Sequence, residues 1–526
     1  MARRFLRLAL LPVAALAVGC GEPYDVVLAG GAVHDGRGGA ARAADVGIRD
    51  GRVATVGDLS GARAETTVDV SGLAVVPGFV DLHSHAVRGV LRHPLAENYL
   101  RQGVTTAMGG PDGGSPLPIG EWLAEFEAEG SAINMGLMVG HGTVRRAVMG
   151  LDDRAPTEAE LDEMRALVDQ AMREGAYGLS TGLKYTPGSF AETEEVIELA
   201  KVAGRYGGIH VSHMREEGLA LLDSVRETIR IGEEGELPTQ VTHHKVVGAP
   251  MWGKSAESLR LVDEAVARGV DVTIDQYPYT ASSTGLTILF PGWSLAGGNE
   301  ALLERLGDPV QRERIRQGVK TNLEVDRGGG SPDNVQISRC AWDPSLEGKT
   351  MGDILRERGL EVNTDNGATL ALELQENGGF GGVFHAMHEE DVRRIMAHPL
   401  TMISSDGGVV APGEGVPHPR NYGTFSRVLS LYVREAGLLS FEEAIRKMAS
   451  FPAERLGLDG RGVIEEEAIA DIAVLDPAAV EEHGEFGDPH HYSTGVQHVL
   501  VPGIFVPPDG EVTGARPGKA LRLNTP

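Results

Sequence analysis

Two histidines stand at the end of an apolar run: His83 and His85 in AVVPGFVDLHSHA, residues 74–86. Side chains two residues apart on a strand point to the same side, so both imidazoles can face one space. A lone His-x-His is often a pair of surface residues, but this pair follows Gly78-Phe79-Val80, a sequence typical of a buried strand. Two imidazoles at the C-terminal end of such a strand indicate a metal site at the mouth of a parallel barrel.

Other strand-like runs also end in polar residues. His213 ends GIHVSH, His243 and His244 end TQVTHH, Asp406 follows TMISS, and Asp112 follows the run near residue 104. Taken singly, each is more often structural, but together they predict one site with nitrogen and oxygen ligands, which suits zinc with an open position. Such a metal activates water and polarises a carbonyl, and Asp406 is placed to pass a proton to a leaving amine. The predicted chemistry is hydrolysis of an amide or a related bond.

These residues need a scaffold of parallel strands, and the sequence has eight candidates. Strand-like runs alternate with amphipathic helical segments, which is typical of βα units. The runs are FVDLH near 79, VTTAM near 104, MGLMVGH near 135, YGLST near 177, GIHVSH near 208, TQVTHH near 239, VDVTIDQY near 270 and TMISSD near 401. The expected fold class is α/β, a (β/α)₈ TIM-like barrel.

The two ends of the chain differ from the middle in their sequence pattern. Residues 21–77 and 456–526 contain short β-rich runs broken by Gly, Asp and Ser, which predicts one small antiparallel β-sandwich domain built from both ends. The barrel is then expected over residues 78–455. Within it, a stretch at about 299–398 follows the seventh strand and contains helical pieces but no barrel strand. A stretch of this length favours an inserted lid or subdomain over a structureless loop.

Composition excludes several functions. The chain has 526 residues and a formal net charge of −27, from 48 Lys and Arg against 75 Asp and Glu. This balance argues against nucleic-acid binding, which needs concentrated cations. Only two cysteines occur, Cys20 and Cys340. A disulfide framework is therefore excluded, and a zinc site must be built mainly from His and carboxylates.

The N-terminus resembles an export signal. MARRFLRLA supplies three arginines, LLPVAALAV is apolar, and Gly19-Cys20 follows. The apolar run is too short to span a bilayer comfortably, which indicates a cleaved signal peptide over residues 1–20. Small residues before a single Cys resemble a bacterial lipobox, although Ala17 stands where Leu is commoner. We expect lipidation at Cys20 and a periplasmic or membrane-anchored protein, with plain secretion as the alternative.

Beyond these patterns, many ordered blocks resemble the amidohydrolase superfamily and, within it, the D-aminoacylase (N-acyl-D-amino-acid deacylase) family. They include VPGFVDLHSH, GVTTAMGGPDGGSP, HVSHMREEG, VTHHKVVG, DQYPYTASSTGL, SSDGG and HPRNYGTFSRVLSLYVRE, and span nearly the whole mature chain. The resemblance implies that His213 and His243 hold the working zinc, that His83 and His85 hold a second metal, and that Asp406 is the general acid/base. His244, beside a ligand, is expected in the second shell.

One position departs from the family pattern. Most members read GNCG with a metal-binding Cys, whereas this chain reads Gly110-Pro111-Asp112-Gly113. A carboxylate is a legitimate zinc ligand, but it is harder than a thiolate and can bridge two metals. We therefore predict one or two divalent metals with Asp112 as a ligand. The alternative is that Asp112 caps a turn.

The substrate carboxylate requires a cation, preferably a guanidinium fork. Lys245 and Arg420 resemble the positions that hold it. The tyrosines Tyr185, Tyr277 and Tyr279 are candidate hydrogen-bond partners or walls, with core packing equally expected, and Arg215 is a candidate for the second shell. Segment 280–300 has no Lys or Arg and contains Leu286, Ile288, Leu289, Phe290 and Trp293. This composition favours neutral or apolar D-residues over acidic ones.

The function predicted is hydrolysis of N-acyl-D-amino acids to a carboxylate and a free D-amino acid. Two alternatives stay open: a hydrolase of D-residue-containing dipeptides or cyclic amides, and a metal- or ligand-binding lipoprotein on an inactive barrel. We expect a small-molecule substrate, no nucleic acid, a possible membrane tether through Cys20 and a possible oligomer.

Overall fold

The computed structural model describes residues 22–506 and 514–523. The predicted signal peptide and Cys20 lie outside these residues. Among the described helices, none has the length and apolar character needed to cross a membrane.

One eight-stranded sheet combines both ends of the described chain. Its path runs β20-β19-β18-β5-β1-β2-β3, with β4 pairing to β1 off this path. The strands are β1 (Tyr24–Val33), β2 (Arg42–Arg49), β3 (Arg52–Gly57), β4 (Ala64–Asp69), β5 (Ala74–Pro77), β18 (Ile472–Leu475), β19 (Val496–Val501) and β20 (Ile504–Phe505). The prediction that both chain ends build one β-domain is confirmed.

The strand pairing in this domain is mixed, so the expectation of a wholly antiparallel unit was wrong. β1 pairs antiparallel with β2 but parallel with β4 and β5. Its register with β2 shifts between Leu28 and Gly31, where Gly30 has φ +78°. At Gly31 an added Cβ would lie 2.6 Å from the Val75 side chain. This glycine bulge lets one long strand pair with β4 and, beyond the bulge, with β5.

The barrel strands run in parallel around the centre of the molecule. They are β6 (Phe79–Asp81), β7 (Val104–Gly109), β8 (Asn134–Leu137), β9 (Val139–Gly140), β10 (Gly178–Gly182), β11 (Ile209–His213), β12 (Thr239–Val241), β13 (Val272–Gln276) and β17 (Thr401–Ile403). Because β8 and β9 continue one another across Met138, these segments fill the eight predicted positions. Backbone hydrogen bonds from Asp406 N to His83 O (2.9 Å) and from His85 N to Gly407 O (2.6 Å) join the last position to the first.

Helices cover the outside of the barrel. They are α1 (Glu97–Leu100), α2 (Ile119–Glu129), α3 (His141–Met149), α4 (Glu158–Arg173), α5 (Thr193–Gly204), α6 (Leu221–Gly235), α7 (Ser255–Ala267), α12 (Glu389–Ala397), α13 (Arg420–Arg427), the π-helix η8 (Val428–Glu435), α14 (Phe441–Met448) and α15 (Ser450–Leu456). In α4 the Thr157 hydroxyl and the Glu160 carboxylate cap each other's backbone N–H, and Met164, Val168, Ala171 and Met172 form its buried stripe.

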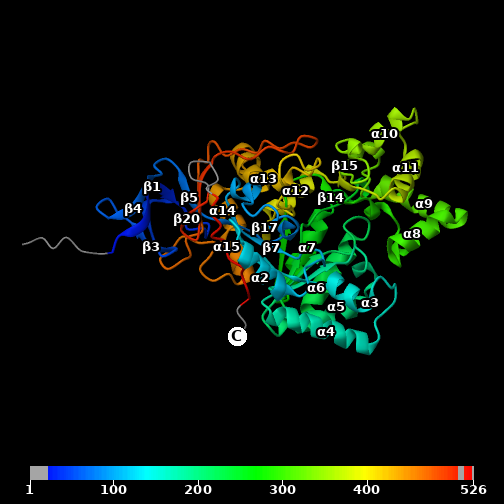
Figure 1. The fold of residues 1–526 in the computed structure, drawn as a ribbon, viewed down its shortest axis with the longest axis horizontal. Helices are drawn as coiled ribbons and strands as arrows, with labels where there is room; N and C mark the ends of the chain where they lie inside the picture. Colours follow the sequence, from blue (N-terminus) through cyan, green and yellow to red (C-terminus); the bar gives the residue numbers. More distant parts are fainter. Residues whose placement is uncertain (1–21, 507–513, 524–526) are drawn as a thin grey trace, which may run out of the picture.

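An insertion occupies the chain between β13 and α12. Its helices are α8 (Gly298–Gly307), α9 (Pro309–Val325), α10 (Met351–Glu357) and α11 (Thr364–Glu376). The sequence indicated α8, α9 and α10, but neither α11 nor the antiparallel sheet β14-β16-β15 (Ser282–Gly285, Gly381–Phe384, Val335–Arg339). A separate hydrophobic cluster runs from Leu286 to Phe384. Figure 1 shows α8–α11 at the opposite end of the molecule from the β-domain.

Short 3₁₀ segments complete the fold. They are η1 (Ala86–Arg88), η2 (Gly188–Phe190), η3 (Ala249–Met251), η4 (Leu286–Leu289), η5 (Gly292–Leu295), η6 (Pro332–Asn334) and η7 (Pro344–Leu346).

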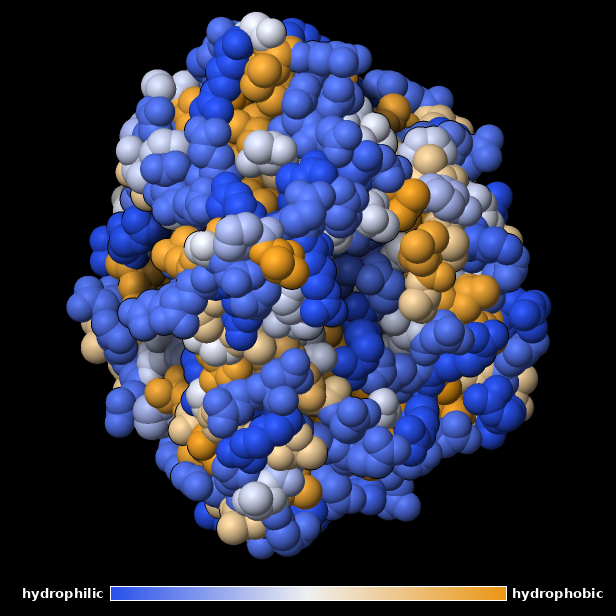
Figure 2. Space-filling view, turned by 90° about the vertical axis from the view of Figure 1, so that its right-hand side faces the viewer, coloured by the Kyte–Doolittle hydropathy of each residue, from blue (hydrophilic) through white to orange (hydrophobic). Residues whose placement is uncertain are grey.

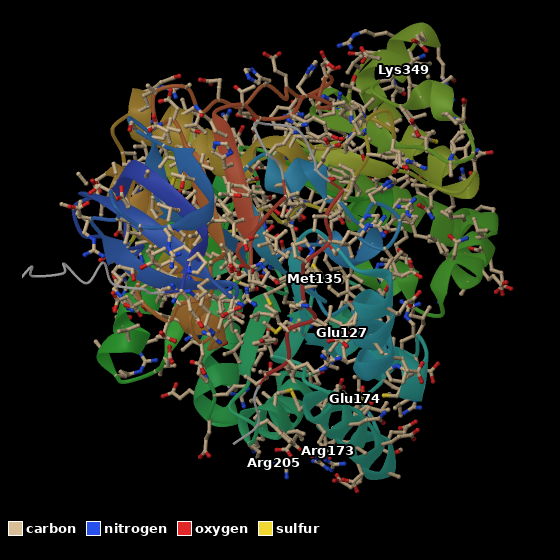
Figure 3. The ribbon with its side chains drawn as sticks, turned by 60° about the vertical axis from the view of Figure 1, so that its left-hand side comes forward. Glu127, Met135, Arg173, Glu174, Arg205 and Lys349 are labelled. Carbon is tan, nitrogen blue, oxygen red and sulfur yellow. The ribbon has the colours of Figure 1, made fainter. Side chains whose placement is uncertain are left out.

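The C-terminal segment 514–523 fastens onto the barrel. Met135 N donates to Lys519 O (3.0 Å) and Leu521 N donates to Met135 O (2.7 Å), while Arg522 pairs with Glu127 of α2 at 2.9 Å. Met135 and Glu127 are labelled in Figure 3. The tail therefore adds main-chain bonds to β8, a strand that supports the site.

The molecular surface reflects the excess of charged residues. The face in Figure 2 is mostly hydrophilic, with apolar residues scattered in small groups, and it is hollowed near its middle.

Candidate metal centre and its pocket

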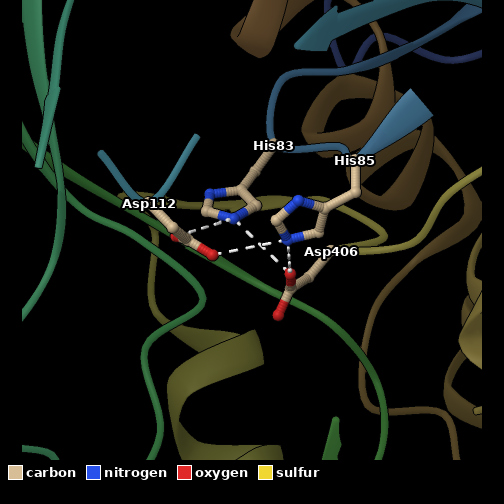
Figure 4. Close-up of side chains that lie close together, drawn as sticks. All are labelled: His83, His85, Asp112 and Asp406. Atoms are coloured by element: carbon tan, nitrogen blue, oxygen red, sulfur yellow. Dashed lines mark hydrogen bonds and ion pairs between the residues drawn. The ribbon is translucent and has the colours of Figure 1, made fainter. Parts of the chain in front are cut away.

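Four side chains meet where the first, second and last barrel positions end (Figure 4). His83 Nε2 lies 3.3 Å from Asp112 Oδ1 and 3.6 Å from Asp406 Oδ1. His85 Nε2 lies 3.3 Å from Asp112 Oδ2 and 3.1 Å from Asp406 Oδ1. The ligand atoms of these four residues lie within 4.8 Å of one another, which is compact enough for one metal ion.

A second group of ligand atoms shares Asp112. His213 Nδ1 and His243 Nε2 lie 3.6 and 3.3 Å from Asp112 Oδ1, and 2.7 Å from each other. Asp112 therefore faces His213, His243 and His83 with one oxygen and His85 with the other. This arrangement allows one carboxylate to serve two metal positions.

Three of these residues have left-handed backbone conformations: φ is +56° at Asp112, +34° at His243 and +49° at Asp406. For residues other than Gly, such conformations cost about 1–3 kcal/mol each and tend to occur at functional sites. Buried side chains hold the adjacent backbone in place. Asp275 accepts from His243 N at 2.8 Å, and Asp81 accepts from Ser405 N at 2.9 Å.

The donor chemistry fits a metal. His83 Nε2 is buried and has no hydrogen-bond partner in the described chain, although it faces two carboxylates. The donors are imidazole nitrogens and carboxylate oxygens, which suit zinc and related divalent ions. Cys340 lies buried in the hydrophobic core of the insertion and is not one of these donors.

The two carboxylates are held in their ionised form. Burial by itself raises the pKa of Asp406, but Arg420, with Nη1 2.9 Å from Asp406 Oδ2, holds it well below its ordinary range. Burial acts likewise on Asp112, and His83 and His243 hold its pKa well below the usual value. Both groups are therefore ready to bind a cation or accept a proton.

Three residues of the centre, His85, Asp112 and Asp406, line a pocket of about 960 Å³. Arg420, Tyr185 and Arg215, three of the residues singled out from the sequence, line this pocket. Arg420 also lies over the Tyr277 ring, with its guanidinium carbon 4.8 Å from the ring centroid. The Tyr185 ring packs against His213 at 4.5 Å.

Lys245, Tyr277 and Tyr279 are buried and, like His83, His213 and His243, are not among the lining residues. Lys245 Nζ donates to Glu217 Oε1 at 2.7 Å and lies 5.4 Å from the centroid of Tyr277. Tyr279 donates to Glu482 at 2.7 Å. Of these three, Tyr277 packs against the Arg420 guanidinium, whereas Lys245 and Tyr279 donate to the carboxylates of Glu217 and Glu482.

The two residues predicted for the second shell have other partners. His244 Nε2 lies 2.8 Å from Ser258 Oγ of α7, and burial lowers the pKa of this imidazole to about 3. Arg215 pairs with Glu227 and donates to the carbonyls of Ser189 and Ala191. Arg215 therefore organises a loop of the pocket rather than a metal ligand.

One wall of the pocket is apolar. Its residues include Leu183, Ile288, Phe290, Pro291 and Leu295. Of the five apolar residues noted in segment 280–300, Ile288 and Phe290 therefore reach the pocket. The other three, Leu286, Leu289 and Trp293, belong to the insertion's core or pack against it.

Sequence reasoning missed two charged residues behind the histidines, Glu217 and Arg327. Glu217 Oε1 lies 3.2 Å from His243 Nδ1, and Arg327 pairs with the other oxygen of Glu217. For Glu217 a signal existed, because it stands four residues after His213 in HVSHMREEG. No local pattern in VDRGGG pointed to Arg327.

Comparison with known proteins places this geometry in context. The model of the amidohydrolase family matches residues 66–306 and 360–507. The D-aminoacylase of Alcaligenes xylosoxydans xylosoxydans is 37% identical over 523 residues, which cover 95% of this chain and 98% of that protein.

Two solved structures share the fold. A D-aminoacylase structure, concerned with the role of that enzyme's binuclear metal centre, has a TM-score of 0.80 and 35% identity over 95% of this chain and 100% of the other. The N-acyl-D-glutamate deacylase of Bordetella bronchiseptica, solved with zinc and a phosphonate mimic of the tetrahedral intermediate, has a TM-score of 0.81 and 33% identity over the same shares.

Proposed function

The chain belongs to the amidohydrolase family, within its D-aminoacylase branch, and from this premise we propose that it is a metal-dependent hydrolase of N-acyl-D-amino acids. The products are a carboxylate and a free D-amino acid. The observation that carries the proposal is the pair of His-carboxylate groups that share Asp112 in the wall of a pocket.

The metal ligands we propose are His83, His85, Asp112, His213 and His243. A bound zinc ion supplies Lewis acidity to a carbonyl and to water. The chain's own contribution is to direct five donors at one space and to keep Asp112 ionised between the two groups. Asp112 Oδ1 faces His83, His213 and His243, and its Oδ2 faces His85, so this carboxylate could serve both groups.

Asp406 is proposed to move the proton. Its carboxylate lies beside His83 and His85 and is held ionised by Arg420. It can therefore accept a proton from the attacking water and return it to the leaving nitrogen. Arg420 lines the pocket and is proposed to orient the substrate's carboxylate through its remaining donors.

The substrate's side chain is proposed to contact the apolar wall formed by Leu183, Ile288, Phe290 and Leu295. These four side chains are uncharged, and Lys184, which also lines the pocket, is paired with Glu216 and Asp326, so neutral or apolar D-residues should be favoured over acidic ones. The comparison of kcat/KM for N-acetyl-D-leucine with that for N-acetyl-D-glutamate tests this. A clear preference for glutamate would contradict the assignment.

The activity itself is tested by release of free amine from N-acetyl-D-leucine, with N-acetyl-L-leucine as the stereochemical control. Hydantoins and D-residue-containing dipeptides belong in the same assay, because the sequence left both open as alternatives. We expect turnover of the acyl-D-amino acid by the zinc-loaded protein. Zero turnover of every acyl-D-amino acid, with zinc bound, would refute the proposal.

We also propose export with lipidation at Cys20. Support comes from the three N-terminal arginines, the apolar run and Gly19-Cys20. In a Gram-negative host, the wild-type chain should sediment with membranes and Cys20→Ser should not. Equal distribution of both would argue for plain secretion or retention.

A further inference from the structure

Glu217 is a buried carboxylate that the proposed chemistry does not use. It is 1% exposed and lies behind the metal centre in the loop that follows β11. Its Oε1 is 3.2 Å from His243 Nδ1, and its Oε2 is 3.6 Å from His213 Nε2. These are the ring nitrogens opposite the ones that face Asp112. One carboxylate therefore stands behind both histidines.

Two cations hold this carboxylate, one at each oxygen. Lys245 Nζ donates to Oε1 at 2.7 Å, and Arg327 Nη2 donates to Oε2. Arg327 is 3% exposed and also donates to Ser282 Oγ of β14 at 2.8 Å. A buried carboxylate with a single cation could rotate toward it, whereas a cation at each oxygen fixes the carboxylate plane.

Arg327 belongs to the insertion, 110 residues beyond Glu217. It follows α9 at a turn of three glycines, Gly328 to Gly330. At Gly328 an added Cβ would lie 2.2 Å from Leu323 Cα, and Gly329 has φ +58°. The turn thus folds tightly onto the end of α9 and directs the preceding arginine into the barrel.

We propose that Arg327 and Glu217 are a positioning pair through which the insertion sets the metal affinity of the His213–His243 site. The Glu217 charge lies 3.2 Å from His243 Nδ1, where Lys245 Nζ also lies 2.6 Å away, and 3.6 Å from His213 Nε2. A negative charge at the rear nitrogens favours the ring proton there and leaves the front nitrogens free for a metal. The inference rests on the proposed function only in taking these two histidines as metal ligands. The insertion then completes the metal centre in addition to forming a pocket wall.

Zinc affinity, measured by competition with a chromophoric chelator and without substrate, tests the pair. Arg327→Met and Glu217→Gln should each weaken the affinity by about 10–100-fold, the range for partners behind a ligating histidine. Arg327→Lys should recover part of the loss, because it keeps the charge but cannot reach both Ser282 and Glu217 with one fork.

Arg145→Met is the matched control. Arg145 is buried and pairs with Glu195, whose other oxygen lies 2.8 Å from His141 Nε2, so this cluster has the same chemistry away from the metal centre. Its zinc affinity should equal that of the wild type even if the protein is less stable. A tenfold loss in this control as well would overturn the proposal, because the effect would then be general.

Wild-type zinc affinity in folded Arg327→Met and Glu217→Gln would overturn it too. If Arg327→Met does not fold, Glu217→Gln and Arg327→Lys, which retain the volume, decide in the same way. Because no substrate is present, this test is separate from the proposed deacylation. If the variants bind zinc weakly and the wild type shows no deacylase activity, the proposed function is refuted and the role of the Arg327–Glu217 pair stands.

Discussion

Two buried clusters in this barrel share an Arg–Glu–His arrangement and have different consequences; the Glu217 cluster adds Lys245 and a second histidine. In one, Glu217 lies between Arg327 and the imidazoles of His213 and His243. In the other, Glu195 of α5 lies between Arg145 and His141 at the start of α3. Each carboxylate is buried and each has a guanidinium on one side and an imidazole on the other.

The difference lies at the far nitrogen of each imidazole. His213 and His243 turn theirs toward Asp112, whereas His141 Nδ1 is buried and has no hydrogen-bond partner among the described residues. His141 also lies close to its carboxylate, at 2.8 Å, while His213 stands 3.6 Å from Glu217. An Arg–Glu–His cluster thus ties two helices together in one place and backs a metal centre in the other. What faces the imidazole decides the role.

The largest expected effect is a loss of catalysis at the metal centre that leaves the Glu195 cluster intact. Asp406→Asn should lower kcat by about 10²–10⁴-fold, the range for loss of a general acid/base, since an amide cannot accept the proton. Zinc content should stay near that of the wild type, because five other donors remain. Steady-state kinetics with metal analysis check this. Retained turnover would refute the assigned role of Asp406.

A change at the other cluster should affect stability and spare the chemistry. Glu195→Gln leaves Arg145 buried without its carboxylate, which costs about 3–5 kcal/mol for a buried pair. Denaturant unfolding of the metal-free protein should reveal this loss, while kcat of the zinc-loaded enzyme stays within about twofold of the wild type. A large fall in kcat at full zinc occupancy would show that the two clusters are not separable.

Asp112 is the residue that distinguishes the two clusters, because the imidazoles of His213 and His243 face it. Asp112→Asn should weaken zinc binding by at least ~10–100-fold, the loss that follows removal of a residue hydrogen-bonded to a metal ligand. Asp112 is itself a donor to both groups, so its loss should cost at least as much. Asp112→Cys should restore binding of at least one equivalent, because thiolate is a good zinc ligand. Chelator competition measures both. Wild-type affinity in Asp112→Asn would favour a turn-capping role for Asp112.

Much of this architecture could be predicted from the sequence, for a physical reason. Parallel barrel strands are buried on both faces, so they are continuous apolar runs, and their carboxyl ends must meet. The five proposed ligands and Asp406 all follow such runs, and the structure brings them together. By contrast, β14 and β16 have four residues each and contain glycines, which gives too little pattern to predict a sheet.

Side-chain direction was less predictable than strand position. Lys245 and Tyr277 follow strand ends as His243 does, yet Lys245 Nζ donates to the buried Glu217 carboxylate. Residue type cannot tell a substrate contact from a buried counter-ion. Arg327 was out of reach for a further reason: its partner lies 110 residues away, and no spacing rule links the two.

The last prediction concerns His210, whose pKa is affected by His141 of the Glu195 cluster. Burial, together with a smaller contribution from His141, lowers the pKa of His210 to about 3, and the ring nitrogens contact Thr181 and Thr239. Between about pH 3 and 6.5 the unfolded chain, in which the pKa of this histidine is near 6.5, therefore binds a proton that the folded protein does not bind. Stability from this group is complete above pH 6.5 and falls as the pH drops toward 3.

At pH 4.5 this penalty amounts to about 3 kcal/mol, at about 1.4 kcal/mol for each of two pH units. His210→Gln should have a shallower decline in unfolding free energy between pH 7 and 4.5 than the wild type. Both proteins are compared in the metal-free state, so the titration of the metal ligands contributes equally and cancels in the difference. Parallel pH profiles would mean that His210 can be protonated in the folded protein. The Glu195 cluster would then tolerate a second positive charge, whereas at the metal centre Glu217 offsets such a charge.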